Sequence, residues 1–229
     1  MPRQLHRTVR VSDDVRRRFG RQLRRWFRAN GRDLPWRRTR DPYRILVSEL
    51  MLQQTQVSRV LERYDDFLRE FPTLASVASA PRARVMEAWS GLGYYARARN
   101  LHALARAVTD DAGLPSDPDA LRKLPGIGAY TAGAVASFAY ERRAPLVDTN
   151  VARVLRRVFA PRLDPKTSRG QRALWVLAET VLPRRGRDAW THNQAIMELG
   201  ALVCTARVAR CRECPVRAVC RTGHVMGHA

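Results

Sequence analysis

The chain has 229 residues, enough to bury a sizeable core as one large domain or as two small lobes. Its 42 lysines and arginines outnumber 21 aspartates and glutamates, which gives a formal net charge of +21 and a pI of about 11.4. Such an excess indicates a polyanionic partner, with nucleic acid favoured over an anionic membrane. No apolar run reaches the roughly 18 residues of a membrane span, and the N-terminus lacks the apolar core of a signal peptide. We therefore expect an intracellular protein, cytoplasmic and associated with the nucleoid, without membrane attachment.

The predicted elements are all helical, because no segment alternates apolar and polar residues over the length of a strand. Residues 1–20 are basic and polar and are expected to precede a short amphipathic helix at 21–30. Asp41 and Pro42 supply the N-cap and first position of a long helical stretch that reaches Phe71. The fold class is therefore all-α. Further helices are expected at 73–89 (a short pair), 96–108, 129–139, 151–159, 171–182 and 188–202.

Glu49 falls in the middle of the apolar part of the stretch that follows Asp41. A carboxylate at such a place is either exposed on a narrow polar face or held in a low-dielectric pocket, where it could serve as a proton donor. The polar residues 53–56 end the apolar run, and their amides could hydrogen-bond to base edges.

The sequence LPGIG at 124–128 predicts a glycine hairpin between two helices. Pro125 disfavours helix at the residue before it, and Gly126 and Gly128 tolerate positive φ. The helix that follows begins with free N–H groups and the positive end of its dipole. Gly126, Ile127 and Gly128 therefore form either a phosphate-binding hairpin or a helix–helix turn without a ligand.

Two further motifs allow a structural and a functional interpretation. Asp148 lies about twenty residues after the hairpin, where the next helix begins. It is either an ordinary N-cap or a carboxylate that faces bound DNA. The glycine turn at 91–95 places Tyr94 and Tyr95 beside an arginine-bearing helix, which suits insertion or stacking into DNA, although one of the two could instead pack in the core.

All four cysteines lie close together near the C-terminus, with the spacing Cys-x6-Cys-x2-Cys-x5-Cys. In an intracellular chain this pattern favours a metal site over a disulfide framework. Four thiolates can hold either Zn²⁺ or an iron–sulfur cluster. Arginines in the same loop favour a structural, DNA-positioning role.

Together these motifs resemble the helix-hairpin-helix DNA glycosylases that carry a [4Fe–4S] cluster, the superfamily of endonuclease III and MutY, over about residues 20–222. The segments LPWR, SELMLQQTQV, GLGYYARARNLH and ELGALVC resemble the MutY adenine glycosylases in particular. The resemblance implies the domain organisation, which is an extension at 1–20, a glycosylase domain at 21–203, a cluster loop at 204–220 and a tail at 221–229. Within the glycosylase domain, one lobe of about 41–150 holds the hairpin at 124–130, and the other combines the N-terminal helix with about 151–203.

The resemblance also implies roles for individual residues. Glu49 would protonate the leaving adenine, and Asp148 would stabilise the sugar cation, with transient covalent attachment as one route. Asn150 would hold the geometry of Asp148, and Tyr130 would line the catalytic pocket. Contacts to the flipped adenine are implied for Arg37 and Gln194, and contacts beside it for Gln54 and one of Tyr94 and Tyr95. The implied ligands of the cluster, for which zinc is the alternative occupant, are Cys204, Cys211, Cys214 and Cys220.

The expected function is that of a monomeric, monofunctional glycosylase of base-excision repair that acts on double-stranded DNA. It would flip out and hydrolyse adenine opposite G or 8-oxoguanine. Bifunctional relatives place a Schiff-base lysine where this chain has Tyr130.

Two other functions remain open. MutY proteins continue into a C-terminal NUDIX-like domain, whereas this chain ends nine residues after Cys220. That length favours the alternative of a thymine or uracil glycosylase acting on G/T and G/U mispairs. The other possible function is that of a non-catalytic iron–sulfur DNA-binding protein, which the presence of both Glu49 and Asp148 disfavours.

Overall fold

The structure is a computed structural model that describes residues 9–108 and 113–223. The outer parts of the expected extension and tail, 1–8 and 224–229, lie outside the described residues. Every regular element in the described ranges is an α-helix or a 3-10 helix, which confirms the all-α class. No helix in these ranges combines the length and the apolar content that a bilayer crossing requires. The chain forms two compact units, which we call the terminal unit (Met1–Arg32 with Pro145–Ala229) and the central unit (Asp33–Ala144).

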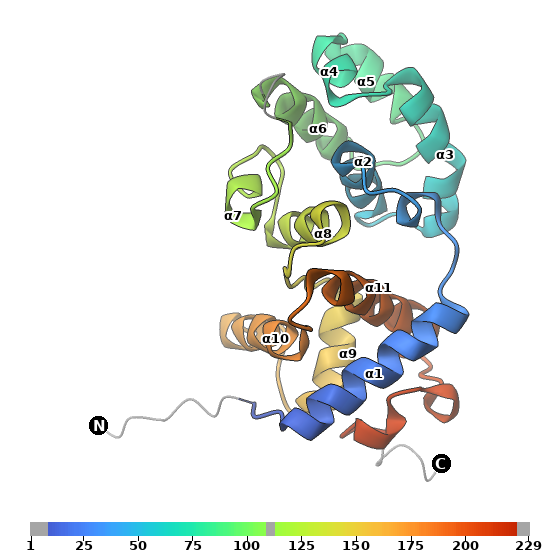
Figure 1. The fold of residues 1–229 in the computed structure, drawn as a ribbon. Coiled ribbons are helices and arrows are strands. Elements are labelled where there is room, and N and C mark those ends of the chain that lie inside the picture. The colour runs from blue at the N-terminus through green and yellow to red at the C-terminus, as the bar shows by residue number, and fades with distance from the viewer. Residues whose placement is uncertain (1–8, 109–112, 224–229) are drawn as a thin grey trace. The chain divides into compact units, whose positions relative to one another are not determined.

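The central unit is built around α2 (Pro42–Leu52), which is buried along almost its whole length. Asp41 caps this helix, because its Oδ1 accepts hydrogen bonds from the backbone N–H groups of Tyr43 and Arg44. Helices α3, α6 and α8 all pack against α2 (Figure 1). The other elements of this unit are η1 (Pro35–Arg37), α3 (Val57–Glu70), α4 (Leu74–Ser79), α5 (Arg82–Ala88), α6 (Ala96–Ala107), α7 (Pro118–Leu121) and α8 (Ala129–Tyr140).

The helical stretch expected from Pro42 to Phe71 is interrupted, contrary to the sequence prediction. Gln53 ends α2 in an extended conformation, and Gln54 adopts a left-handed one with φ of 56°. The polar residues at 53–56 therefore form a turn between α2 and α3 rather than a polar patch on one helix.

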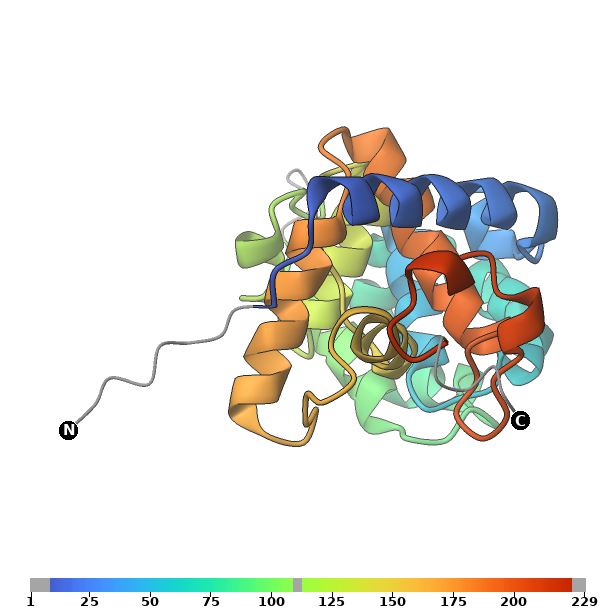
Figure 2. The same ribbon diagram turned by 90° about the horizontal axis from the view of Figure 1, so that it is seen from below.

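The terminal unit joins the N-terminal helix to the C-terminal third of the chain. Helix α1 packs on α11, α11 packs on α9, and η3 of the C-terminal loop contacts α1 (Figure 2). Phe19 of α1 meets Phe159 of α9 edge to face, with ring centroids 5.0 Å apart. The elements of this unit are α1 (Asp13–Asn30), α9 (Thr149–Phe159), α10 (Ser168–Val181), α11 (Gly186–Leu202), η2 (Cys211–Glu213) and η3 (Arg217–Val219).

Helix α1 begins at Asp13, eight residues earlier than the sequence suggested. The side chain of Ser12 accepts a hydrogen bond from the N–H of Val15, and Asp13 and Asp14 complement the positive end of the helix dipole. Phe19 is fully buried, so the apolar face also starts within residues that the sequence analysis assigned to a polar extension.

The terminal unit resumes at Pro145, whereas the sequence analysis ended the other lobe at about 150. The difference concerns the segment that carries Asp148. Because Asp148 caps α9, this segment belongs with the helix that follows it.

Candidate active site and cysteine pocket

In the central unit, Glu49 and Tyr130 are in direct contact. Glu49 lies on α2 with only 3% of its surface exposed. The phenolic O–H of Tyr130, in the first turn of α8, donates a hydrogen bond of 2.8 Å to its Oε2. A buried carboxyl group needs hydrogen-bond donors to offset its lost hydration. The sequence allowed Glu49 to be either exposed or buried, and in the structure it is buried.

Arg97 of α6, a residue that the sequence analysis did not single out, joins the two turns that carry Gln54 and Tyr94. Its guanidinium donates to carbonyl oxygens at the end of α2 and in the glycine turn, and only 6% of the residue is exposed. Gln54 and Tyr94 both have left-handed backbones, with φ of 56° and 46°. Arginine is suited to this role because one planar group carries five donors. The carbonyl acceptors are Leu50 (2.9 Å), Met51 (2.7 Å), Gln53 (2.5 Å), Leu92 (2.9 Å), Gly93 (2.9 Å) and Tyr94 (3.3 Å).

The predicted glycine hairpin is formed, and its two glycines differ in what they require. Gly126 has φ of 75°, and a Cβ there would lie 2.5 Å from Cβ of Asn100. This position therefore needs glycine for both its conformation and its close packing on α6. Gly128 is exposed, is the N-cap of α8 and provides no side-chain cap. Ile127 is 7% exposed and anchors the hairpin in the core.

In the terminal unit, Asp148 and Asn150 form a hydrogen-bonded pair at the start of α9. Asp148 Oδ1 accepts from the N–H of Val151 at 2.7 Å, and Oδ2 accepts from Nδ2 of Asn150 at 3.2 Å. Burial raises the pKa of Asp148, and the hydrogen bonds from Val151 and Asn150 oppose part of that shift. The carboxyl group is thus the N-cap of α9, and burial removes part of the hydration of its charged form.

Arg153 and Gly200, which the sequence analysis did not single out, fix Asn150 from two sides. Arg153 donates to Oδ1 of Asn150 at 2.6 Å and to the carbonyl oxygens of Gly200 and Cys204 at 2.8 and 2.7 Å. A Cβ on Gly200 would lie 2.6 Å from Cβ of Asn150. Glycine at this point of α11 therefore allows the close approach of α9. The only sequence signal for this contact was the spacing, because Arg153 lies three residues after Asn150 on the same helix.

The remaining predicted contact residues are placed as follows. In the central unit, Arg37 is partly buried in η1, and Tyr94 and Tyr95 are 60% and 40% exposed. Neither tyrosine is a core residue, so the core-packing alternative is wrong for both. In the terminal unit, Gln194 is 5% exposed on α11.

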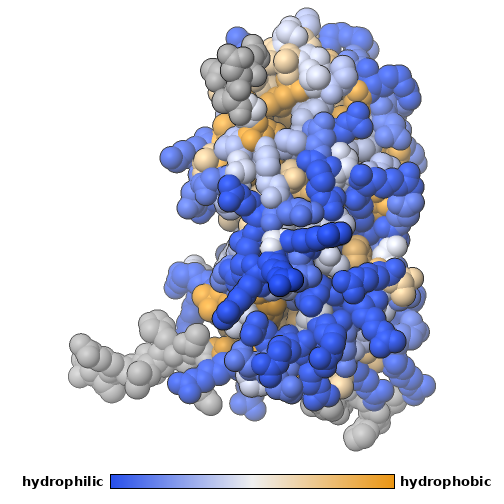
Figure 3. Space-filling view, in the orientation of Figure 1, coloured by the Kyte–Doolittle hydropathy of each residue, from blue (hydrophilic) through white to orange (hydrophobic). Residues whose placement is uncertain are grey.

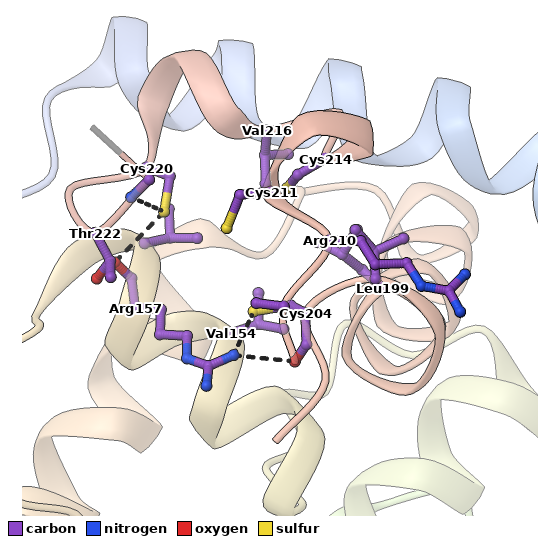
Figure 4. Close-up of a pocket in the computed structure, with 14 residues that line it drawn as sticks. Val154, Arg157, Leu199, Cys204, Arg210, Cys211, Cys214, Val216, Cys220 and Thr222 are labelled. Carbon is purple, nitrogen blue, oxygen red and sulfur yellow. Dashed lines mark hydrogen bonds between the residues drawn. The ribbon is translucent and has the colours of Figure 1, made fainter. Parts of the chain in front are cut away.

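The four cysteines line one pocket in the terminal unit (Figure 4). Apolar side chains form part of its wall, among them Val154 of α9, Leu199 of α11 and Val203 at the C-cap of α11. In the ranges that the structure describes, no three acidic, histidine or cysteine side chains are grouped closely enough to hold a metal ion.

Polar donors reach the sulfur atoms of Cys204, Cys214 and Cys220, the second through the backbone N–H of Val216. Arg157 Nη1 donates to Sγ of Cys204 at 3.4 Å, and the N–H of Gly223 donates to Sγ of Cys220 at 3.2 Å (Figure 4). Burial raises the pKa of Cys214 to about 11, so its thiolate is unfavourable without a compensating cation. The cysteines do not converge on a single ion, but all four line one pocket that has an apolar wall and donors to sulfur, surroundings that suit a thiolate-held group larger than one metal ion.

Two helical units, a glycine hairpin and a four-cysteine loop define a helix-hairpin-helix fold. A family model described as "HhH-GPD superfamily base excision DNA repair protein" matches residues 47–180, and the chain belongs to this family.

Curated relatives are similar over most of the chain. The chain is 44% identical to the adenine DNA glycosylase of Rattus norvegicus over 91% of its own length and 42% of the rat protein. It is 46% identical to the adenine DNA glycosylase of Mycobacterium tuberculosis, over 83% of the chain and 63% of that protein. The chain thus spans about two fifths of the rat relative and less than two thirds of the mycobacterial one.

Solved structures show the same fold. A thermostable thymine-DNA glycosylase superposes with a TM-score of 0.84 at 32% identity, covering 93% of this chain and 98% of that one. A trapped covalent intermediate of endonuclease III with DNA superposes with a TM-score of 0.78 over 96% of this chain and all of that one. Its identity of 23% supports likeness of fold alone.

Proposed function

We propose that the chain is a DNA glycosylase that excises adenine mispaired with G or 8-oxoguanine. The observation that carries the proposal is the buried Glu49 held by Tyr130, because a carboxyl group shielded from water is suited to protonating a leaving base. The adenine DNA glycosylases of rat and Mycobacterium tuberculosis, at 44% and 46% identity, support adenine as the base.

Cleavage of an N-glycosidic bond needs an acid for the leaving base and a negative charge for the developing sugar cation. Glu49 would donate the proton to adenine. Asp148, fixed by Val151 and Asn150, would stabilise the sugar cation through its Oδ atoms. Desolvation strengthens this electrostatic attraction, because the local dielectric constant is lower than that of water.

The base has to leave the helical stack before either carboxyl group can act on it, at a cost of a few kcal/mol that is smaller for a mispair. The exposed Tyr94 and Gln54 would occupy the space beside the extruded base, and Arg37 and Gln194 would contact the adenine. The hairpin at 126–128 would bind a DNA phosphate through backbone N–H groups at the start of α8.

The proposed reaction is hydrolysis without strand cleavage. Tyr130 carries no amine that could form a Schiff base, and the chain has only two lysines, Lys123 and Lys166. Borohydride should therefore trap little protein on DNA, and efficient trapping would contradict the monofunctional assignment.

Excision of thymine or uracil opposite G is the second candidate. It is supported by the thymine-DNA glycosylase structure, whose whole length this chain nearly matches at 32% identity. The buried acid and the capped aspartate suit either base, because the sugar chemistry is the same.

For the cysteine pocket we propose a [4Fe–4S] cluster held by Cys204, Cys211, Cys214 and Cys220. Zinc requires four ligands that converge on one ion, whereas each iron of a cluster takes its own thiolate, so that four sulfur atoms lie apart around a pocket. Arg157 and Gly223, which donate to sulfur, would stabilise the bound thiolates. When bound, the group would hold the C-terminal loop against α9 and α11, whose residues line the pocket. Iron and sulfide analysis of protein purified without oxygen tests the assignment, and stoichiometric zinc would overturn it.

The activity is tested by single-turnover assays on duplexes with A opposite G, A opposite 8-oxoguanine, T opposite G and U opposite G, each developed with alkali. We expect cleavage of the adenine duplexes and a strongly reduced rate in a Glu49→Gln control. Excision of T or U with adenine untouched would establish the second candidate. No excision from any duplex, with DNA binding retained, would indicate a non-catalytic binding protein.

A further inference from the structure

The outer face of α1 carries a row of arginines that the proposed active site does not use. Arg17, Arg21, Arg25 and Arg28 follow one another at spacings of four, four and three residues, so they lie on one side of the helix. All four are exposed. The buried residues Phe19, Gly20 and Leu23 occupy the opposite side. We call this row the arginine stripe.

The arginine stripe has no acidic partner among the residues that the structure describes. The two acidic residues of α1, Asp13 and Asp14, pair with Arg16 and Arg18. The remainder of the helix, 15–30, contains no aspartate or glutamate. Next to the stripe, Arg24 is partly buried near Asp188 of α11, and burial lowers its pKa.

Several exposed arginines on the central unit, by contrast, do have acidic partners. Arg69 pairs with Asp66, and Arg84 pairs with both Glu70 and Glu87, each at 2.8 Å. Like charges one helical turn apart repel each other, so an uncompensated row weakens the helix that carries it. A row of this kind is explained if an external polyanion supplies the missing negative charge.

We propose that the arginine stripe binds the phosphate backbone of double-stranded DNA without regard to base sequence. From Arg17 to Arg28 the helix rises about 16 Å, close to the rise of five base pairs at about 3.4 Å each. Guanidinium groups bind phosphate through paired N–H donors. The stripe can thus contact successive phosphates of one strand, a contact that positions the protein but carries no sequence information.

An anionic membrane fits the stripe less well than DNA does. Helices that bind a membrane surface insert a row of large apolar side chains between the lipids. The exposed residues of α1 include no large apolar side chain, and the apolar ones face α11 and α9. In the face shown in Figure 3, the surface over α1 is predominantly hydrophilic.

The test compares the salt dependence of binding to a 25-base-pair duplex without a mispair. The stripe variant is Arg17→Gln with Arg21→Gln and Arg25→Gln, which leaves Arg28 in place at the end of the helix. The matched control is Arg44→Gln with Arg69→Gln and Arg84→Gln, which removes the same charge from exposed arginines that already have acidic partners. Circular dichroism of both variants checks that α1 remains folded.

We expect the slope of log K against log salt to become shallower by about 2 to 3 in the stripe variant, because each lost phosphate contact removes about 0.9. The control should change by less than about 1. Equal changes in both variants would show that only net charge matters, and an unchanged slope in the stripe variant would also overturn the proposal. A selective loss of binding to phosphatidylserine vesicles, with duplex binding intact, would reassign the stripe to a membrane. Because the duplex contains no mispair, the result does not depend on whether the chain excises adenine.

Discussion

Tyr130 donates a hydrogen bond of 2.8 Å to the buried carboxyl group of Glu49, and this contact joins the helix after the glycine hairpin to the central helix α2. Tyr130, which closely follows the hairpin in sequence, therefore orients Glu49, the proposed acid. A change in the hairpin can act on the chemistry through this contact as well as on DNA binding.

Removing the proposed acid and removing its partner should have effects of different size. Glu49→Gln keeps an acceptor for Tyr130 but cannot donate a carboxylic proton, so we expect single-turnover excision to fall by roughly 10² to 10⁴. Tyr130→Phe leaves the acid in place with one donor fewer, and we expect a loss of about tenfold. If Tyr130→Phe were as inactive as Glu49→Gln, the tyrosine would take part in the reaction itself.

Asp148→Asn should separate stability from activity. Asparagine also caps helices well, so α9 should stay intact, while the loss of negative charge should reduce excision at least about a hundredfold. Because burial raises the pKa of Asp148, the folded state holds this proton more tightly than the unfolded state. The aspartate therefore lowers the free energy of unfolding progressively as pH rises from its pKa in the unfolded state to its higher pKa in the folded state.

The thermal midpoint of Asp148→Asn should accordingly exceed that of the wild type at pH 7, and the difference should shrink as pH falls toward 4. The sign follows from the direction of the pKa shift: the buried carboxylate charge destabilises the folded state, and protonation in acid makes the carboxyl group as neutral as the amide. A lower midpoint at pH 7 would show that its hydrogen bonds outweigh the desolvation of its charge.

Arg97→Lys should destabilise the central unit although it keeps the charge. A lysine has three donors on one nitrogen and cannot reach acceptors in both turns, so buried carbonyl groups lose their partners. We expect a loss of roughly 2–4 kcal/mol in the free energy of unfolding, measured by urea denaturation. The control is Arg99→Lys, exposed on the same helix, which should change the free energy by less than about 0.5 kcal/mol.

Gly200→Ala should damage the site of Asp148 without touching either proposed catalytic residue. The new methyl group would meet Cβ of Asn150 at 2.6 Å, so α9 and α11 have to separate. We expect a lower thermal midpoint and a loss of excision greater than that of Gly20→Ala, a substitution inside α1 where the new methyl group would meet only the end of the flexible Arg24 side chain, at 3.0 Å. Equal behaviour of the two variants would show that the close approach at Gly200 is not required.

The sequence alone determined the features that depend on local chemistry. Helical periodicity marked most of the helices, Asp41 and Asp148 marked two of the caps, and the glycines of LPGIG marked the hairpin. These signals are readable because capping, positive φ and hydrophobic period involve residues close together in the chain. The start of α1 and the break at Gln54 were missed. The first was hidden by the many arginines around Phe19, and the second because no glycine or proline marks the turn at 53–56.

Only the tertiary structure decided whether Glu49 is buried or exposed and what surrounds Asp148. Burial of Glu49 depends on α8 packing against α2, and its partner Tyr130 lies 81 residues away. Arg97 bonds to carbonyls more than 40 residues distant, and Gly200 meets Asn150 from another helix. Periodicity and propensity report the neighbours of a residue along the chain, whereas these contacts form when distant helices pack and exclude water, which no local pattern encodes.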